Sequence, residues 1–358
     1  MRRILVVATR QIGDVLLTTP LIHAARERWP EASIDVLGFE GTLAVLRGNA
    51  DVHEAIAIPA RGGAWALARR LWRRYDLALV ADAGDRAHLA GFVAAPRRAG
   101  LLPERSSSNW WKRALLSHAV TQSGDRGQLH VVPEKLRLLE PWGQVRAGTV
   151  VPPAAAPLPP ALGARLVRGY VVVHTPSMWP YKQWPLAHFQ QLVALLTMAG
   201  RQVVLTGGPG AHDRACVAAM QGFGPRELVV DAGVLDFNQL AELLEGAALY
   251  IGPDTSVSHL AAACGTQVLA IFGPTNPQRW APWPAGATQP VSFMRRAPAQ
   301  RVGNVTLLQS TLPCVPCGRA GCEDHRQSAT ECLPGLEPGR VALQALQLLG
   351  AKLESDPE

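Results

Sequence analysis

The sequence predicts an α/β protein of two domains, each built on a doubly wound parallel sheet. Three observations lead to this prediction. Short apolar runs alternate with helical segments through both halves of the chain, which is typical of parallel sheets covered by helices. A proline-rich stretch, VPPAAAPLPPA at 151–161, interrupts this alternation. The chain has 358 residues, which is more than a single hydrophobic core usually serves.

The first half opens with an apolar run, RILVVA at 3–8, which is typical of a central strand. Gly13 and Asp14 stand at the turn that follows this strand. Pro20 lies inside the next apolar segment and predicts a helix start or a kink near Thr18-Thr19. The elements expected next are a strand at 33–38, a helix at 42–47 and a strand at 76–82.

The proline-rich stretch belongs to a predicted linker at 151–168, because proline disfavours both a helix interior and a sheet ladder. The N-terminal domain is expected at 1–150 and the C-terminal domain at 169–335, with a helix and an acidic tail at 336–358. The elements expected after the linker are a strand and turn at 170–177, strands at 202–206, 228–231, 249–251 and 267–272, and helices at 186–199, 237–246 and 338–353.

The stretch LYIGPDTSVSHLAAACGTQVLAIFGPT at 249–275 is typical of strand, turn, helix and strand in succession. Asp254, Thr255 and Ser256 are residue types that favour the start of a helix. In a parallel sheet, a helix that begins just after the carboxyl end of a strand offers an anion its free N–H groups and its dipole. The pattern fits an anion site, and it also fits an ordinary capped helix.

Composition indicates a globular protein, with 48% hydrophobic and 18% charged residues. No apolar run approaches the roughly 20 residues of a membrane span. The start, MRRILVVATRQIGD, has an apolar core that is too short for a secretory signal. We therefore expect a cytoplasmic protein. Its net charge of +7 favours acidic partners.

Basic residues cluster in the first half. Residues 64–75, AWALARRLWRRY, predict an amphipathic helix. Its apolar face would contain Ala64, Leu67, Ala68, Leu71, Trp72 and Tyr75, opposite Arg69, Arg70, Arg73 and Arg74. A second cluster contains Arg97, Arg98, Arg105, Lys112 and Arg113, with Trp110 and Trp111 between them. These are either solvated faces or an attachment to an anionic membrane surface or a phosphorylated substrate. No nucleic-acid recognition motif accompanies them, so no nucleic acid is expected as a partner.

Four of the six cysteines are bunched, with His325 nearby. They are Cys314, Cys317, Cys322 and Cys332. Thiols at such spacing suit a structural zinc site or an iron–sulfur cluster. Reduced free cysteines and disulfides are the alternatives, although a cytoplasmic protein rarely keeps disulfides. No catalytic role is expected for these residues.

Four motifs in order carry a family resemblance. They are IGDVLLTTPLIHAARERWP, HTPSMWPYKQWP, VLTGGPGAHD and GPDTSVSHLAAACGTQVLAIFGPTNPQRWAPW. From Ile4 to about Trp283 the chain resembles the heptosyltransferases of lipopolysaccharide core assembly, glycosyltransferase family 9. The resemblance implies a GT-B fold, in which two Rossmann-like domains with parallel sheets face each other across a cleft.

The same resemblance implies an activity. An inverting glycosyltransferase would move heptose from ADP-L-glycero-D-manno-heptose to an anionic, lipid-linked core oligosaccharide. It would need no metal or other cofactor for catalysis. It would work as a peripheral protein at the cytoplasmic face of the inner membrane. The alternatives are a related transferase that uses another nucleotide sugar for another surface glycan, and a non-catalytic nucleotide-sugar-binding protein on the same scaffold.

The resemblance also implies roles for particular residues. Asp14 matches the catalytic base, which takes the proton of the acceptor hydroxyl; as a residue type it also suits a helix N-cap. Lys182 matches the phosphate-binding lysine, and Asp254 a residue that holds sugar hydroxyls. The remaining predicted substrate-binding residues are Ser177, Asp213 near the ribose, Leu235 at the adenine, and Thr255, Ser256 and His259 at the diphosphate. A packing role is the alternative for His259. The residues before Lys182 and the serine at 256 depart from the family pattern, which leaves the exact sugar open.

Overall fold

The structure of the protein is a computed structural model that describes residues 1–59, 62–104, 109–124, 127–143, 145, 148–287, 289 and 291–353. Arg105, of the second basic cluster, and the acidic tail after 353 lie outside the described residues. The chain divides into two compact units. The N-terminal unit comprises Met1–Ala154 and Gly286–Val291, and the C-terminal unit comprises Ala155–Ala285 and Ser292–Glu358. The predicted domain and linker boundaries remain predictions.

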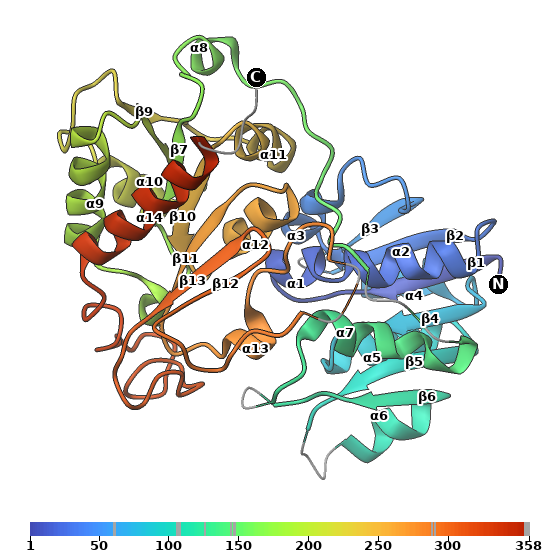
Figure 1. Cartoon of the computed structure of the whole chain (residues 1–358). Coiled ribbons are helices and arrows are strands. Elements are labelled where there is room, and N and C mark those ends of the chain that lie inside the picture. Colours follow the sequence, from blue (N-terminus) through green and yellow to red (C-terminus); the bar gives the residue numbers. More distant parts are fainter. Residues whose placement is uncertain are drawn as a thin grey trace. The chain divides into compact units, whose positions relative to one another are not determined.

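The N-terminal unit is a six-stranded sheet with helices packed against it (Figure 1). Its strands are β1 (Arg3–Val7), β2 (Ser33–Phe39), β3 (Glu54–Ile58), β4 (Leu77–Val80), β5 (Arg97–Leu102) and β6 (His118–Thr121). Its helices are α1 (Ile12–Leu16), α2 (Thr19–Arg28), α3 (Glu40–Leu43), α4 (Ala64–Leu71), α5 (Asp85–Ala94), α6 (Trp110–Leu115) and α7 (Val131–Leu136), with 3-10 helices η1 (Ala44–Leu46) and η3 (Arg137–Trp142).

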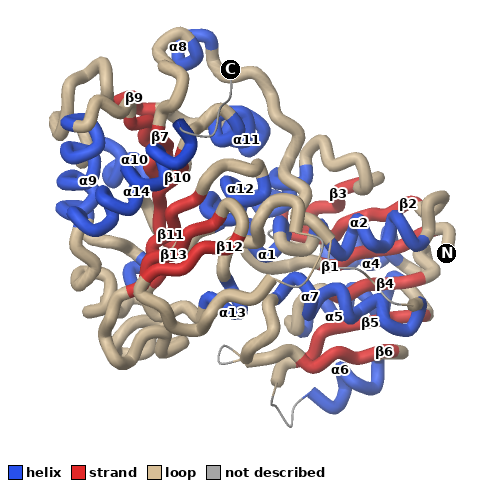
Figure 2. Tube along the Cα trace, viewed as in Figure 1, coloured by secondary structure: helices blue, strands red, loops and turns tan. Residues whose placement is uncertain are grey.

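The strand order of this sheet is β3-β2-β1-β4-β5-β6, and every neighbouring pair is parallel. Figure 2 shows these strands side by side. The order reverses direction between β1 and β4, and such a switch point is where open parallel sheets bind their ligands. Pro20 lies in the first turn of α2, so the predicted helix start near Thr18-Thr19 is confirmed.

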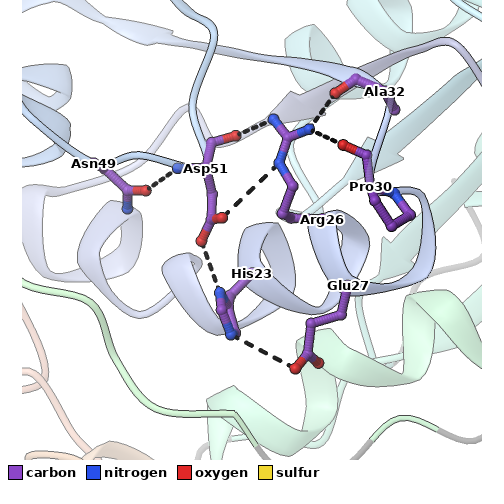
Figure 3. Close-up of polar contacts among 7 residues, drawn as sticks. All are labelled: His23, Arg26, Glu27, Pro30, Ala32, Asn49 and Asp51. Atoms are coloured by element: carbon purple, nitrogen blue, oxygen red, sulfur yellow. Dashed lines mark hydrogen bonds and ion pairs between the residues drawn. The ribbon is translucent and has the colours of Figure 1, made fainter.

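A polar network ties α2 to the segment that joins it to β2 and to the loop before β3 (Figure 3). The Arg26 guanidinium donates to the carbonyl oxygens of Pro30 (2.8 Å), Ala32 (2.6 Å) and Asp51 (3.1 Å). The Asp51 carboxylate also contacts Nδ1 of His23 at 2.8 Å. Because one side chain serves three backbone carbonyls, the position of α2 depends strongly on Arg26.

The C-terminal unit has a seven-stranded sheet (Figure 1). Its strands are β7 (Val171–His174), β8 (Val203–Thr206), β9 (Val229–Asp231), β10 (Leu249–Pro253), β11 (Val268–Phe272), β12 (Ala299–Val302) and β13 (Val305–Gln309). Its helices are α8 (Pro160–Gly163), α9 (Leu186–Met198), α10 (Ala211–Ala218), α11 (Phe237–Glu245), α12 (Ser256–Ala263), α13 (Pro277–Trp280) and α14 (Pro338–Leu353), with the 3-10 helix η4 (Pro180–Lys182).

The strand order here is β12-β13-β11-β10-β7-β8-β9, and the order reverses between β10 and β7. All pairs are parallel except the β12–β13 pair at one edge, which is antiparallel. The predicted class, two doubly wound sheets that are mainly parallel, is therefore confirmed. The short helix α8 begins at Pro160, so the expectation of no helix within 151–161 is wrong at its last residues. Proline is tolerated there because it occupies the first turn.

Candidate functional site

The C-terminal unit gathers most of the predicted site residues at the carboxyl edge of its sheet. Ser177 and Lys182 follow β7, and Asp254 follows β10, the neighbouring strand across the switch point. Asp213 lies after β8 and Leu235 after β9. The sheet order therefore brings together four loops that are far apart in the sequence.

Lys182 and Asp254 form an ion pair across the switch point. Lys182 Nζ lies 2.6 Å from Asp254 Oδ2, and their side chains are 23% and 7% exposed. Burial alone raises the pKa of Asp254, but the charge of Lys182, hydrogen bonds from Lys182 and Thr275 and the charge of His259 together lower it. The carboxylate therefore stays ionised, and it holds the lysine ammonium beside the start of α12.

The loop that carries Lys182 is braced on both sides. Gln183 accepts a hydrogen bond from the Ser177 N–H at 2.8 Å, and its amide donates to the Thr175 carbonyl at 2.8 Å. Trp184 is fully buried, and its indole N–H donates to the Leu336 carbonyl at 3.0 Å. These hydrogen bonds fix the backbone before and after Lys182. Ser177 is itself buried, and its hydroxyl donates to the Trp179 carbonyl at 3.2 Å, so it shapes this loop.

The predicted helix start at 254–256 is α12, with Thr255 at the N-cap and Ser256 as its first residue. Thr255 is a favoured N-cap residue type, but its side chain makes no hydrogen bond to the helix, so the anion site and the ordinary capped helix both stay predictions. Both residues are partly exposed. His259, one turn later, is buried and acts on the Asp254 carboxylate through its charge. The structure therefore places His259 beside the ion pair, in addition to its packing in α12.

Two predicted nucleotide residues have local structural roles. Asp213 Oδ2 accepts a hydrogen bond from the Gly208 N–H at 2.9 Å, which closes the glycine-rich turn after β8. Leu235 is half-buried and directly precedes Asp236, the N-cap of α11. Neither role excludes contact with a nucleoside.

His174, at the end of β7, was not singled out from the sequence. Its Nδ1 lies 3.1 Å from the Thr206 hydroxyl at the end of β8. Burial lowers the pKa of His174 to about 4, so the ring is neutral at physiological pH. It links the carboxyl ends of two strands without adding charge.

The N-terminal unit has a second polar cluster at its own switch point. After β1, Thr9 donates its N–H and its hydroxyl to Asp82 Oδ2, both at 2.7 Å, and Asp82 follows β4. Asp82 also accepts the Gly84 N–H at 2.8 Å and is only 3% exposed. Asp14 lies in the first turn of α1 and is partly exposed. The N-cap of α1 is Gln11, so the capping interpretation of Asp14 is wrong.

Lys135, on α7, is the main residue that sequence reasoning missed here. Its Nζ donates to the Asp14 carbonyl at 2.7 Å and to the Thr18 hydroxyl at 2.8 Å. The side chain is 5% exposed. A lysine in a short segment of mixed polarity gives no signal of burial, whereas the position of Asp82 at the end of the predicted strand 76–82 was a usable signal.

The predicted zinc site is not supported. In the described part of the chain, which includes all four bunched cysteines, no group of three or more His, Cys, Asp or Glu side chains is arranged to hold a metal ion. The cysteines are recorded as free: Cys314, Cys317, Cys322 and Cys332. Cys332 is buried, and burial raises the pKa of its thiol to about 11 despite a hydrogen bond from Thr330.

The described residues of the two basic clusters lie on and just after α4, in β5 and on α6. Leu71 and Tyr75 are buried as expected, but Trp72 is 64% exposed because α4 ends at Leu71 and the chain turns away. Trp65 and Trp110 are also exposed, at 77% and 75%. Lys112 does not belong to an exposed charged face. It is buried, with Nζ 2.6 Å from Asp85 Oδ1 and 2.9 Å from the Ala83 carbonyl.

Across the residues that the structure describes, no helix combines the length and the apolar character needed to cross a lipid bilayer.

Comparison with known proteins gives a consistent result. The sequence profile of glycosyltransferase family 9 (heptosyltransferase) matches residues 64–308. Lipopolysaccharide heptosyltransferase 3 of Escherichia coli K12 is 30% identical over 291 residues, covering 76% of this chain and 83% of the relative. Lipopolysaccharide heptosyltransferase 1 of Pseudomonas aeruginosa is 26% identical over 380 residues, covering 97% of this chain and 98% of the relative.

Solved structures show the same fold. The E. coli ADP-heptose LPS heptosyltransferase II superposes with a TM-score of 0.70 at 20% identity, covering 99% of this chain and all of that one. A glycosyltransferase family 9 protein from Veillonella parvula gives a TM-score of 0.72 at 19% identity, covering 99% of this chain and 98% of that one. The predicted GT-B fold class is confirmed by this likeness.

Proposed function

The chain belongs to glycosyltransferase family 9, the heptosyltransferase family, and we propose that it transfers heptose from ADP-L-glycero-D-manno-heptose to a lipopolysaccharide core acceptor. Membership makes it a glycosyltransferase. The donor and acceptor are proposed because the curated relatives are named lipopolysaccharide heptosyltransferases. A solved relative carries ADP-heptose in its name, which supports the same donor.

The observation that carries the proposal is the Lys182–Asp254 pair at the switch point of the C-terminal sheet. In the proposed reaction, the bond between the anomeric carbon and the diphosphate oxygen breaks, and negative charge grows on the leaving ADP. The Lys182 ammonium and the start of α12 would stabilise that charge. Asp254 would hold hydroxyls of the donor sugar. Because Lys182 and the start of α12 supply positive charge at this site, we propose that no metal or other catalytic cofactor takes part.

Asp14 is proposed as the general base of an inverting reaction. The acceptor hydroxyl oxygen attacks the anomeric carbon, its proton passes to the Asp14 carboxylate, and ADP departs from the opposite face. Two carboxylates lie at the switch point of the N-terminal sheet. Asp82 is buried and accepts three hydrogen bonds, which suits a structural brace. Asp14 reaches solvent, which suits contact with an acceptor.

The remaining predicted contacts extend the donor site. Thr255, Ser256 and His259 are proposed to bind the diphosphate, because the first two open α12 and the third lies near Asp254. Leu235 and Asp213 are proposed to border the nucleoside from the loops after β9 and β8. Ser177 is proposed to act by shaping the loop that carries Lys182.

The acceptor and the cell compartment belong to the same proposal. The exposed tryptophans Trp65, Trp72 and Trp110 stand near exposed arginines on α4 and α6. Aromatic rings beside cations favour an anionic membrane interface. We therefore propose a cytoplasmic protein that attaches peripherally to the inner membrane and meets its anionic, lipid-linked acceptor there. Binding to vesicles with anionic phospholipid should weaken in a Trp65→Ser, Trp72→Ser double variant; unchanged binding would refute this attachment.

The donor-site assignment is tested by calorimetry with ADP. Lys182→Met should weaken ADP binding by about tenfold to a hundredfold, because a hydrogen bond to a charged group contributes roughly 1.5–3 kcal/mol. The matched control is Arg201→Met, which removes a cation at the opposite, amino edge of β8. Equal ADP affinity in wild type and Lys182→Met would remove Lys182 from the phosphate site.

A panel of nucleotide sugars separates the rival functions. Turnover with another nucleotide sugar and none with ADP-heptose would keep the fold and the site but replace the donor. Nucleotide binding without turnover on any acceptor would favour the non-catalytic binding protein.

A further inference from the structure

The Lys135 ammonium is a buried positive charge, and its burial disfavours the charged form. The side chain is 5% exposed, and burial lowers its pKa to about 8. The charged groups that act on it are Asp14, Asp82 and Glu134, which favour its positive charge, and Arg10, which disfavours it. Burying a lysine in this way is costly unless its contacts are specific.

The contacts of Lys135 converge on the turn that carries Asp14. Its ammonium donates to the Asp14 carbonyl at 2.7 Å and to the Thr18 hydroxyl at 2.8 Å. The Thr18 hydroxyl in turn donates to the same Asp14 carbonyl at 2.7 Å. The carbonyl would therefore keep one hydrogen bond without the lysine. What the lysine adds is a second hydrogen bond, from a cation that is fixed on α7.

We propose that Lys135 is a positioning residue for sugar transfer, which holds the turn of Asp14 through a hydrogen bond to its carbonyl and through charge attraction. The inference rests on the proposed role of Asp14 as base. A base must stay within hydrogen-bond reach of the hydroxyl it deprotonates, and a small displacement of a reacting group lowers the rate strongly. Lys135 touches neither substrate nor reacting atoms in this account.

The proposal has a signature in the pH dependence of kcat. Lys135 loses its proton as pH rises through about 8. Its attraction for Asp14 then disappears and its hydrogen bond to the carbonyl weakens. The wild-type kcat should therefore fall above pH 8. If Lys135 only supported the fold, the loss of its proton near pH 8 would leave kcat unchanged.

The test measures kcat, the KM for the donor and thermal stability from pH 6 to 10 in wild type and in variants. Lys135→Met removes the ammonium and keeps the apolar stem, and it should lower kcat by about tenfold or more while leaving the donor KM unchanged. The decline near pH 8 should vanish. Lys135→Arg keeps the charge and should move that decline to higher pH. Thr18→Val should lower kcat but retain the decline.

Tyr75→Phe is the control for a structural effect. The Tyr75 hydroxyl donates to Asp35 Oδ2 at 2.7 Å in the same unit, at the amino end of β4. Its loss should reduce stability and leave kcat and its pH profile unchanged. A Lys135→Met enzyme with the wild-type kcat and the decline near pH 8 would overturn the inference. Asp14→Asn distinguishes the two proposals. If this variant stays active, Asp14 is not the base, and the inference about Lys135 fails with it. If Asp14→Asn is inactive while Lys135→Met matches wild type, only the inference about Lys135 fails.

Discussion

The free energy of unfolding should rise with pH, because Lys135 titrates inside the fold. Burial lowers its pKa from the ordinary 10.5 to about 8. Between these values the unfolded chain holds a proton that the folded chain has lost, so stability increases as pH rises. One pKa unit corresponds to about 1.4 kcal/mol. From pH 7 to pH 10 the contribution of Lys135 to the free energy of unfolding should therefore grow by about 2.5 kcal/mol.

The assay is urea unfolding at pH 7, 8, 9 and 10, followed by circular dichroism, for wild type and Lys135→Met. Other groups titrate over this range in both proteins, and the difference between the two curves isolates Lys135. Lys135→Arg serves as a second reference, because a guanidinium stays protonated in folded and unfolded chains at these pH values. Wild type should gain stability relative to both variants as pH rises.

A constant difference between wild type and Lys135→Met from pH 7 to 10 would refute this reasoning. It would mean that Lys135 titrates alike in folded and unfolded chains and is not a desolvated cation. A difference that falls with pH would also contradict it, because the fold would then be favouring the charged form.

Two further predictions concern other parts of the fold. Arg26→Met should lower the free energy of unfolding by about 2 kcal/mol in urea, because three carbonyl oxygens lose a donor; an unchanged free energy would show that these bonds contribute nothing net. His174 has its pKa lowered to about 4 by burial, so the unfolded chain binds its proton first as pH falls. Between pH 7 and 4.5 the free energy of unfolding of wild type should fall by about 2 kcal/mol relative to that of His174→Asn. An equal change in the two proteins would contradict this.

The donor side of the candidate site was predicted from the family resemblance, which assigned Lys182 and Asp254. Lys182 and Asp254 lie in two separate motifs, and each motif alone indicates only a strand followed by a turn. Parallel-sheet topology then brings the carboxyl ends of β7 and β10 together, which places the two side chains 2.6 Å apart. The strand runs and the helix break at Pro20 were predictable from the sequence, since each depends on neighbouring residues alone.

Features that depend on tertiary packing could not be predicted. Lys135 lies 121 positions from Asp14 in the sequence, and only the packing of α7 against α2 brings them together. Trp72 fits the apolar face of a longer helix, but α4 ends before it and the ring is exposed. The spacing of the four bunched cysteines fits a zinc site, yet spacing does not fix where each thiol points, and Cys332 is buried.

The edge strand β12 and its neighbour β13 show a further limit. β13 is fully buried but follows a region of weak pattern, and β12 is short, with partly exposed residues. Neither strand alternates with a helix in the way that identifies the other strands. These two strands are neighbours in sequence and pair antiparallel through a short turn, whereas the other pairs of the sheet are parallel.

The central claim is that Asp14 deprotonates a lipopolysaccharide acceptor during heptose transfer from ADP-heptose. Its most direct test is acceptor-dependent ADP release, measured with ADP-heptose and heptose-deficient lipopolysaccharide for wild type and Asp14→Asn. We expect release by the wild type and a loss of about 100-fold to 10,000-fold in the variant, with ADP affinity retained. Equal release by Asp14→Asn, or no acceptor-dependent release by the wild type, would contradict the claim.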